Sequence, residues 1–218
     1  MDYDTFIEGL LYYYQLYDNG LKKQANKYIA DYVHTISAWD KQKLNGILFQ
    51  FVQELCDEKE YDFLKRGNSR LPYALDIVLR DYLYSECLKN MMPQLRWFYE
   101  LYRDDKNDCM YAKDMLERAY SSSERDEKTV ELLFDSWLDV LGWGAHHFPD
   151  GCIITKETMR NAVEKCKKII CENEVDEKLK EELRYYELLY QCYYKYKNEG
   201  ERRSFQEYCS EANISFYE

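Results

Sequence analysis

Two adjacent histidines, His146 and His147, are the residues whose type and spacing most plainly suggest chemistry. They lie in GWGAHHFPDG, residues 142–151, where glycine and proline fill four of the ten positions. Such a composition is typical of an irregular loop, and Trp143 and Phe148 are large enough to wall a pocket beside the imidazoles. We predict a long loop between helices that either presents the histidines to a ligand or is held down by its own aromatic side chains.

A metal at this loop would need further ligands. Asp150 or Cys152 could join the two imidazoles. Zinc sites, however, normally show a second ligand pair at a recognisable spacing, and the only other histidine is His34. His34 and Asp31 do not form the Glu-x-x-His motif of di-iron helix bundles. We therefore predict no metal and no cofactor.

Catalytic nucleophiles are not indicated either. The sequence has no G-x-S-x-G, phosphate-binding loop, G-x-G-x-x-G or H-E-x-x-H motif. Ser136 has no histidine at helical spacing. Cys152 is close to His146 and His147 only in sequence, which says little about geometry. We predict no catalytic residues.

Tyrosine is the most unusual part of the composition, with 23 residues in 218. Tyr186, Tyr190 and Tyr194 recur at every fourth residue and share one face of a predicted helix. A tyrosine hydroxyl needs water or a partner, so many rings favour half-exposed seams or a recognition groove. Core packing at helix crossings, with hydroxyls at the rim, is the alternative. The candidate binding residues are Tyr186, Tyr190, Tyr194, Trp143, His146 and His147.

The charge of the chain restricts its partners. Lysine and arginine total 30 against 41 acidic residues, a net charge of −11, and residues 172–218 hold 7 basic and 12 acidic residues. Nucleic acids and anionic membranes select for basic surfaces, so we predict neither as a partner. The acidity fits a basic protein or peptide, and it also fits solubility alone.

The sequence also carries expectations about location. No apolar run approaches the roughly 18 residues of a membrane span, and the first 20 residues are acidic, unlike a secretory signal. The eight cysteines are dispersed and form no C-x-x-C pair, which is typical of thiols buried in a reducing compartment. We expect a cytoplasmic protein.

Apolar spacing predicts helices along most of the chain and no strand. Only 8 glycines and 3 prolines interrupt it. The ten or eleven expected helices cover about residues 4–19, 21–36, a segment ending at 55, 61–65, 71–89, 93–103, 108–120, 123–141, 155–171, 176–198 and 204–212.

Several helix starts are predicted from their first residues. Ser37-Ala-Trp-Asp40 and Ser123-Glu-Arg-Asp126 have the pattern of capping boxes, and Asp108 and Thr155 are predicted N-caps. Proline suits the first turn of the helices near 72 and 93.

Short matches recur at an offset of about 85 residues. Tyr14-Gln-Leu-Tyr17 recurs as Tyr99-Glu-Leu-Tyr102, and Leu48-Phe49 as Leu133-Phe134. Their common offset favours one four-helix unit used twice, at about 1–85 and 86–171, with a partial third at 172–218. We predict a single helical-repeat domain, and chance matches among so many tyrosines are the alternative.

Helix lengths and turns such as Tyr17-Asp-Asn-Gly20 and Lys197-Asn-Glu-Gly200 give most of the chain a resemblance to helix-pair repeat proteins. The chain resembles the α-α superhelices of the tetratricopeptide and HEAT families. It lacks the tetratricopeptide consensus residues and the 34-residue period. The resemblance implies an all-α superhelix of antiparallel helix pairs that binds a protein or peptide.

Three functional hypotheses follow. The first is a non-enzymatic scaffold that presents a Tyr-rich, acidic surface to a protein or peptide. The second is an acidic inhibitor of the immunity or antidote type, which neutralises a basic toxin or nuclease. The third is an enzyme built on the His146-His147 loop. The sequence identifies neither the partner nor the oligomeric state.

Overall fold

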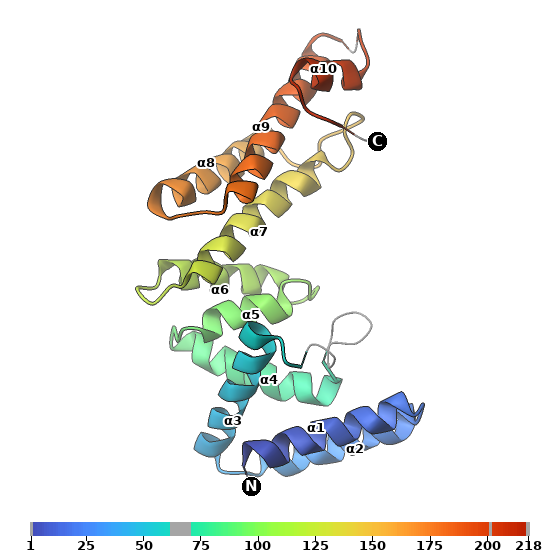
Figure 1. Cartoon of the computed structure of the whole chain (residues 1–218), viewed down its shortest axis with the longest axis vertical. Helices are drawn as coiled ribbons and strands as arrows, with labels where there is room; N and C mark the ends of the chain where they lie inside the picture. The colour runs from blue at the N-terminus through green and yellow to red at the C-terminus, as the bar shows by residue number, and fades with distance from the viewer. Residues whose placement is uncertain (1, 62–70, 201, 217–218) are drawn as a thin grey trace. The chain divides into compact units, whose positions relative to one another are not determined.

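The structure is a computed structural model that describes residues 2–61, 71–200 and 202–216. This part of the chain contains ten α-helices, one five-residue π-helical turn and no β-strand, which confirms the predicted all-α fold (Figure 1). The elements are α1 (Tyr3–Asp18), α2 (Lys22–Ser37), α3 (Lys41–Gln53), the π-helical turn η1 (Glu54–Glu58), α4 (Tyr73–Leu88), α5 (Gln94–Tyr102), α6 (Cys109–Ser121), α7 (Glu127–Ala145), α8 (Lys156–Glu172), α9 (Glu177–Asn198) and α10 (Phe205–Glu211).

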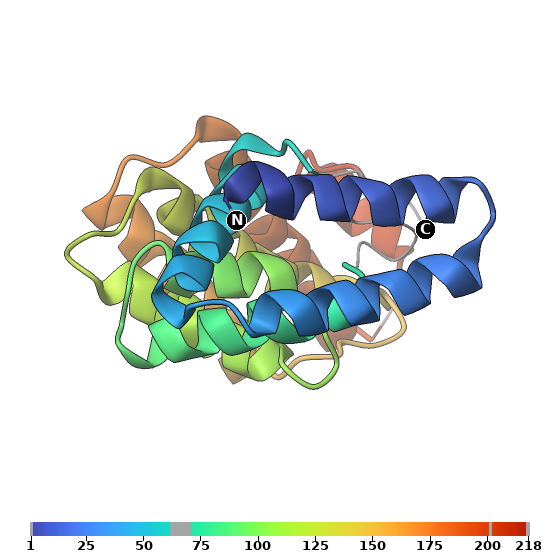
Figure 2. The ribbon, with the colours of Figure 1, turned by 90° about the horizontal axis from the view of Figure 1, so that it is seen from below.

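The chain forms two compact units, residues 1–122 and 123–218. In the first unit α1 and α2 make an antiparallel hairpin, α2 packs on α4, and α5 packs on both α4 and α6 (Figure 2). In the second unit α7 packs on α8 and α9, and α10 packs on α9. This packing of consecutive helices is compatible with an α-α superhelix. The boundary between the units falls inside the second predicted repeat, and the 85-residue repeat itself stays a prediction.

Apolar spacing located the helices to within a few residues. Of the N-caps predicted from the sequence, the one at Thr155 is confirmed, because its side chain accepts a hydrogen bond from the amide of Thr158. The glycines expected to end α1 and α9 do so in left-handed conformations, with φ of 77° at Gly20 and 73° at Gly200. The helix predicted for 61–65 lies outside the described residues apart from Tyr61, which is in a turn.

The two predicted serine capping boxes are wrong. Ser37 is the last residue of α2, and its hydroxyl donates to the carbonyl of Val33. Asp40 is the N-cap of α3 instead. Likewise Asp126, not Ser123, caps α7, with its carboxylate accepting from the amide of Thr129 at 2.8 Å. The aspartate at the end of each motif is therefore the capping residue, because it is the last residue outside the helix.

Asp108 precedes α6 as predicted, but its side chain makes no capping hydrogen bond. Its carboxylate pairs with Arg80 of α4. The Arg80 guanidinium also pairs with Asp76 at 3.0 Å and lies 4.4 Å from the centre of the Tyr102 ring. An arginine is thus held between an aromatic face and carboxylates inside the first unit.

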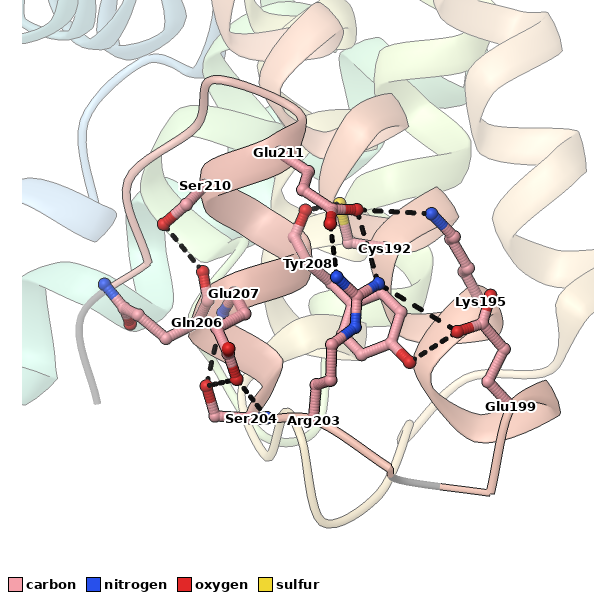
Figure 3. A network of polar contacts seen from close by, with 10 residues as sticks. All are labelled: Cys192, Lys195, Glu199, Arg203, Ser204, Gln206, Glu207, Tyr208, Ser210 and Glu211. Atoms are coloured by element: carbon pink, nitrogen blue, oxygen red, sulfur yellow. Dashed lines mark hydrogen bonds and ion pairs between the residues drawn. The ribbon is translucent and has the colours of Figure 1, made fainter.

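The second unit contains the same arrangement at its C-terminal helix pair (Figure 3). The Arg203 guanidinium lies 4.4 Å from the centre of the Tyr208 ring and pairs with Glu211. The Tyr208 hydroxyl donates to Glu199 at 2.7 Å, which ties the start of α10 to the end of α9. Ser204 and Glu207 form a capping box at the start of α10.

A buried ion pair joins η1 to α5 in the first unit. Arg96 is 3% exposed, and its guanidinium reaches Asp57 at 2.7 Å and Glu100 at 2.5 Å. The indole of Trp97 donates to the same Asp57 carboxylate at 3.0 Å. These contacts satisfy a charge that would otherwise be costly to bury.

The cysteines are free thiols, and most lie in helices. Five of them are buried: Cys56, Cys87, Cys166, Cys192 and Cys209. Burial raises the pKa of Cys87 and of Cys166 to about 12, so these thiols remain protonated at neutral pH.

Candidate functional site

The segment predicted to be a long irregular loop is partly helical. α7 continues to Ala145, so Gly142, Trp143 and Gly144 belong to its last turn and only His146 onward leaves the helix. The loop is then fixed to the helix end by backbone hydrogen bonds. The amide of Ile153 donates to Gly144 at 3.1 Å, and the amide of Phe148 donates to Ala145 at 3.0 Å. Gly142 and Gly144 are therefore helix residues, and their role lies in packing.

The two glycines allow tyrosines of α9 to approach the backbone of α7. A β-carbon on Gly142 would lie 2.7 Å from the Tyr186 hydroxyl. A β-carbon on Gly144 would overlap the Tyr190 hydroxyl and lie 2.5 Å from Ile154. Two glycines on one helix thus accommodate two tyrosines of another.

The predicted tyrosine stripe divides into a buried and a half-exposed part. Tyr190 is 1% exposed, and its hydroxyl donates to the Leu141 carbonyl at 2.9 Å. It belongs to the core between α7 and α9, as the packing alternative expects. Tyr186 and Tyr194 are half-buried, and Tyr194 lies under the ammonium group of Lys156 at 4.9 Å.

A pocket of about 640 Å³ opens between the end of α7, the loop after it and the middle of α9. It brings together three of the predicted binding residues, Tyr186, His146 and His147. Among the described residues, the lining consists of Gly142, Ala145, His146, His147, Phe148, Pro149, Asp150, Tyr185, Tyr186, Leu189 and Phe216. Half-buried and exposed aromatic rings therefore surround a concave surface within the second unit.

The floor of the pocket is rigid. Phe148 is 6% exposed and stacks on the Tyr193 ring, with centroids 4.1 Å apart. The same ring meets Tyr190 edge-on at 5.1 Å. The alternative that the loop is held down by its aromatic side chains is thus correct for Phe148.

The rim of the pocket, in contrast, is exposed. His146 and His147 are exposed, with ring centroids 5.0 Å apart. Trp143 is 62% exposed and stacks parallel to His146 at 5.7 Å. An indole this exposed buries little apolar area in the chain itself, and tryptophan is enriched where proteins bind one another.

Negative charge surrounds the pocket. Burial raises the pKa of Tyr186, and the nearby carboxylates of Glu182 and Asp139 raise this pKa further. Asp150 contributes a third carboxylate from the loop. No lysine or arginine is among the described residues that line the pocket.

The same region offers little for catalysis or metal binding. Among the described residues, no group of three or more His, Cys, Asp or Glu side chains could hold a metal ion. The Cys152 thiol donates to the Ile154 carbonyl at 3.1 Å and does not line the pocket. The part of the lining that the structure describes has no serine, threonine or cysteine, the residues that imidazole most often activates as nucleophiles.

Sequence reasoning missed an exposed apolar stripe on α4 in the first unit. Tyr73 is 80% exposed and Leu88 60%, and Ile77 and Tyr84 lie between them on the same face. The spacing of four, seven and four residues was visible in the sequence. It was overlooked because the opposite face of α4 is equally apolar.

A second depression in the second unit is lined mostly by acids. It lies between the starts of α7 and α9 and has a volume of about 760 Å³. Its charged lining residues are Asp126, Glu127, Glu131, Glu174, Asp176, Glu177, Arg125 and Lys180. Part of the acidic stretch 172–218 noted in the sequence therefore borders a concave surface.

Comparisons with known proteins give no indication of the function of this chain. No protein-family model matches the sequence. No curated protein and no solved structure shows a match either.

Proposed function

We propose that this chain is a non-enzymatic binding protein that holds a protein or peptide segment at the pocket between α7 and α9. The observation that carries the proposal is the convergence of Tyr186, His146 and His147 on one concave surface, beside the exposed Trp143. Aromatic side chains supply large contact areas at low entropic cost, which makes them frequent hot spots of binding.

The arrangement favours binding over catalysis. Each imidazole at the rim is exposed and lies next to another ring. Among the described lining residues, the only hydroxyl or thiol groups are those of Tyr185 and Tyr186. A catalytic site would combine an imidazole with a nucleophile and a group that orients the base. We therefore place the histidines among the contact residues.

Substitution at the rim is the direct test. The tagged protein is used to capture partners from its native cell, and captured proteins are quantified by mass spectrometry. We expect Trp143→Ala and His147→Ala to reduce capture of a specific partner at least tenfold, as loss of a hot spot does. Both side chains are exposed, so stability should change little.

Tyr73→Ala on α4 is the matched control, because it removes an aromatic ring from the other unit that is exposed even more than Trp143. Unchanged capture by Tyr73→Ala supports the pocket. The reverse pattern, with capture lost in Tyr73→Ala and kept in both rim variants, would assign binding to the α4 stripe and overturn the proposal.

The acidic depression favours a second candidate, an inhibitor that neutralises a basic toxin or nuclease. In this case charge should dominate encounter with the partner. We expect Glu131→Lys combined with Glu174→Lys to slow association several-fold at low salt, with less effect at high salt, because exposed charges are screened. Association rates from surface-immobilised kinetics with the captured partner would measure this.

The effect of the charge reversals on overall binding, compared with their effect on the association rate alone, separates the two candidates. If the charge reversals abolish binding at every salt concentration while the rim variants bind normally, the inhibitor hypothesis replaces the pocket. If the reversals change only the association rate, the acids steer a partner that the pocket holds.

A further inference from the structure

Two arginines that this chain places against its own tyrosines indicate what the pocket is suited to hold. Arg80 and Arg203 each lie 4.4 Å from the centre of a tyrosine ring. Each also pairs with carboxylates, Asp76 in the first case and Glu211 in the second. The chain thus builds the same guanidinium site twice, once in each unit, from an aromatic face and at least one carboxylate.

The pocket between α7 and α9 offers the same two components to an external group. Tyr185 and Tyr186 supply two rings whose centroids are 5.4 Å apart and whose planes meet at 65°. Phe216 adds a third ring. Such walls suit a planar cation, which stacks on one ring and meets the edge or face of the next.

The electrostatics around these rings favour a cation. Asp150 lines the pocket, and the carboxylates of Glu182 and Asp139 lie close enough to Tyr186 to act on its hydroxyl. Within the described part of the chain, neither lysine nor arginine lines the pocket. The basic groups that the structure describes there are His146 and His147, which occupy the rim rather than the aromatic wall.

We infer that the pocket receives the guanidinium group of an arginine side chain from a basic peptide segment, stacked on Tyr185 or Tyr186 and paired with Asp150. This inference rests on the proposed function and specifies its ligand. Arginine fits better than lysine because its planar group stacks on aromatic faces and bonds a carboxylate through two N–H groups. The net charge of −11 adds a general attraction for basic segments.

The test uses the full chain and three small probes. Nα-acetyl-arginine amide is compared with the citrulline amide, which keeps the shape without the charge, and with the lysine amide, which keeps the charge without the plane. The imidazole signals of His146 and His147 are followed by NMR during titration. His34, on α2 in the other unit, is an internal reference.

We expect the arginine probe to shift both pocket histidines saturably, to leave His34 unchanged and to bind on the order of tenfold more tightly than the citrulline probe. The lysine probe should bind between the two. Asp150→Asn should weaken arginine binding several-fold, and Glu164→Gln, at an exposed position of α8, should not. Asp150 is exposed, so its substitution should not impair folding.

The inference would be overturned if the arginine and citrulline probes bound with equal affinity. It would also be overturned if the arginine probe bound the Asp150→Asn variant as tightly as it binds the unmodified chain. A second experiment distinguishes failure of this inference from failure of the proposed function. Peptides that bind the chain are selected from an unbiased displayed library and titrated in the same NMR assay. If selected peptides without arginine shift the histidines, the pocket binds peptides of another chemistry and only the inference fails. If neither probe nor selected peptide shifts them, both fail.

Discussion

Replacing Arg96 with alanine is expected to lower the free energy of unfolding of the first unit by about 2–3 kcal/mol. The substitution removes a side chain that is 3% exposed, together with its bonds to the carboxylates of Asp57 and Glu100. These carboxylates are partly exposed and Trp97 still donates to Asp57, so the loss combines weaker pairing with the packing of the arginine stem. Urea denaturation followed by circular dichroism would measure the change.

Arg103→Ala is the control for this prediction. Arg103 follows α5 and pairs with Asp104 at 3.9 Å, and the two side chains are 44% and 96% exposed. Surface pairs of this kind contribute about 0–1 kcal/mol. Similar losses in the two variants would mean that neither the ion pairs nor the packing of Arg96 contributes more than a surface pair does.

The second large effect is expected from Gly144→Ala in the second unit. The new β-carbon would overlap the Tyr190 hydroxyl and lie 2.5 Å from Ile154. Tyr190 has little freedom to move because it is buried and bonded to the Leu141 carbonyl. We expect a loss of about 2–3 kcal/mol in the free energy of unfolding, from overpacking and a weakened hydrogen bond, despite the better helix propensity of alanine.

Alanine substitutions of two other glycines serve as references for this loss of stability, measured in thermal or urea melts. A β-carbon on Gly151 meets nothing within 4 Å, so Gly151→Ala should be nearly neutral. Gly142→Ala should have an intermediate effect, since the half-buried Tyr186 hydroxyl it meets can shift toward the pocket. A neutral Gly144→Ala would show that α7 and α9 are packed less closely than the glycines indicate.

Helices were predictable because their signals are local. Apolar spacing and first-turn residues located α8, with its cap at Thr155, to within a residue. The predicted capping boxes were wrong because each motif contains two residues, three positions apart, that can both cap a helix. Ser37 and Asp40 can both cap a helix, and only the point where the backbone leaves the preceding helix decides between them.

The pocket was predictable only in part, for the same reason. His146, His147 and Trp143 are neighbours in sequence, so their clustering could be foreseen. Their contact with the surface around Tyr186 could not be foreseen. α9 packs on α7 although α8 lies between them in the sequence, and no local sequence pattern encodes such a pairing. The glycines of α7 were the available signal, but glycine marks a close helix approach as well as a loop.

The π-helical turn at Glu54–Glu58 suggests how the length of this chain can vary. Such a turn accommodates one residue more than a regular α-helix needs, so a single-residue deletion there would restore α-helical geometry rather than break the helix. It would also rotate Asp57 away from the guanidinium of Arg96. A lineage with this deletion would lose the Arg96–Asp57 pair and keep the Arg96–Glu100 pair, so a deletion before Asp57 should be inherited together with compensating changes around Arg96.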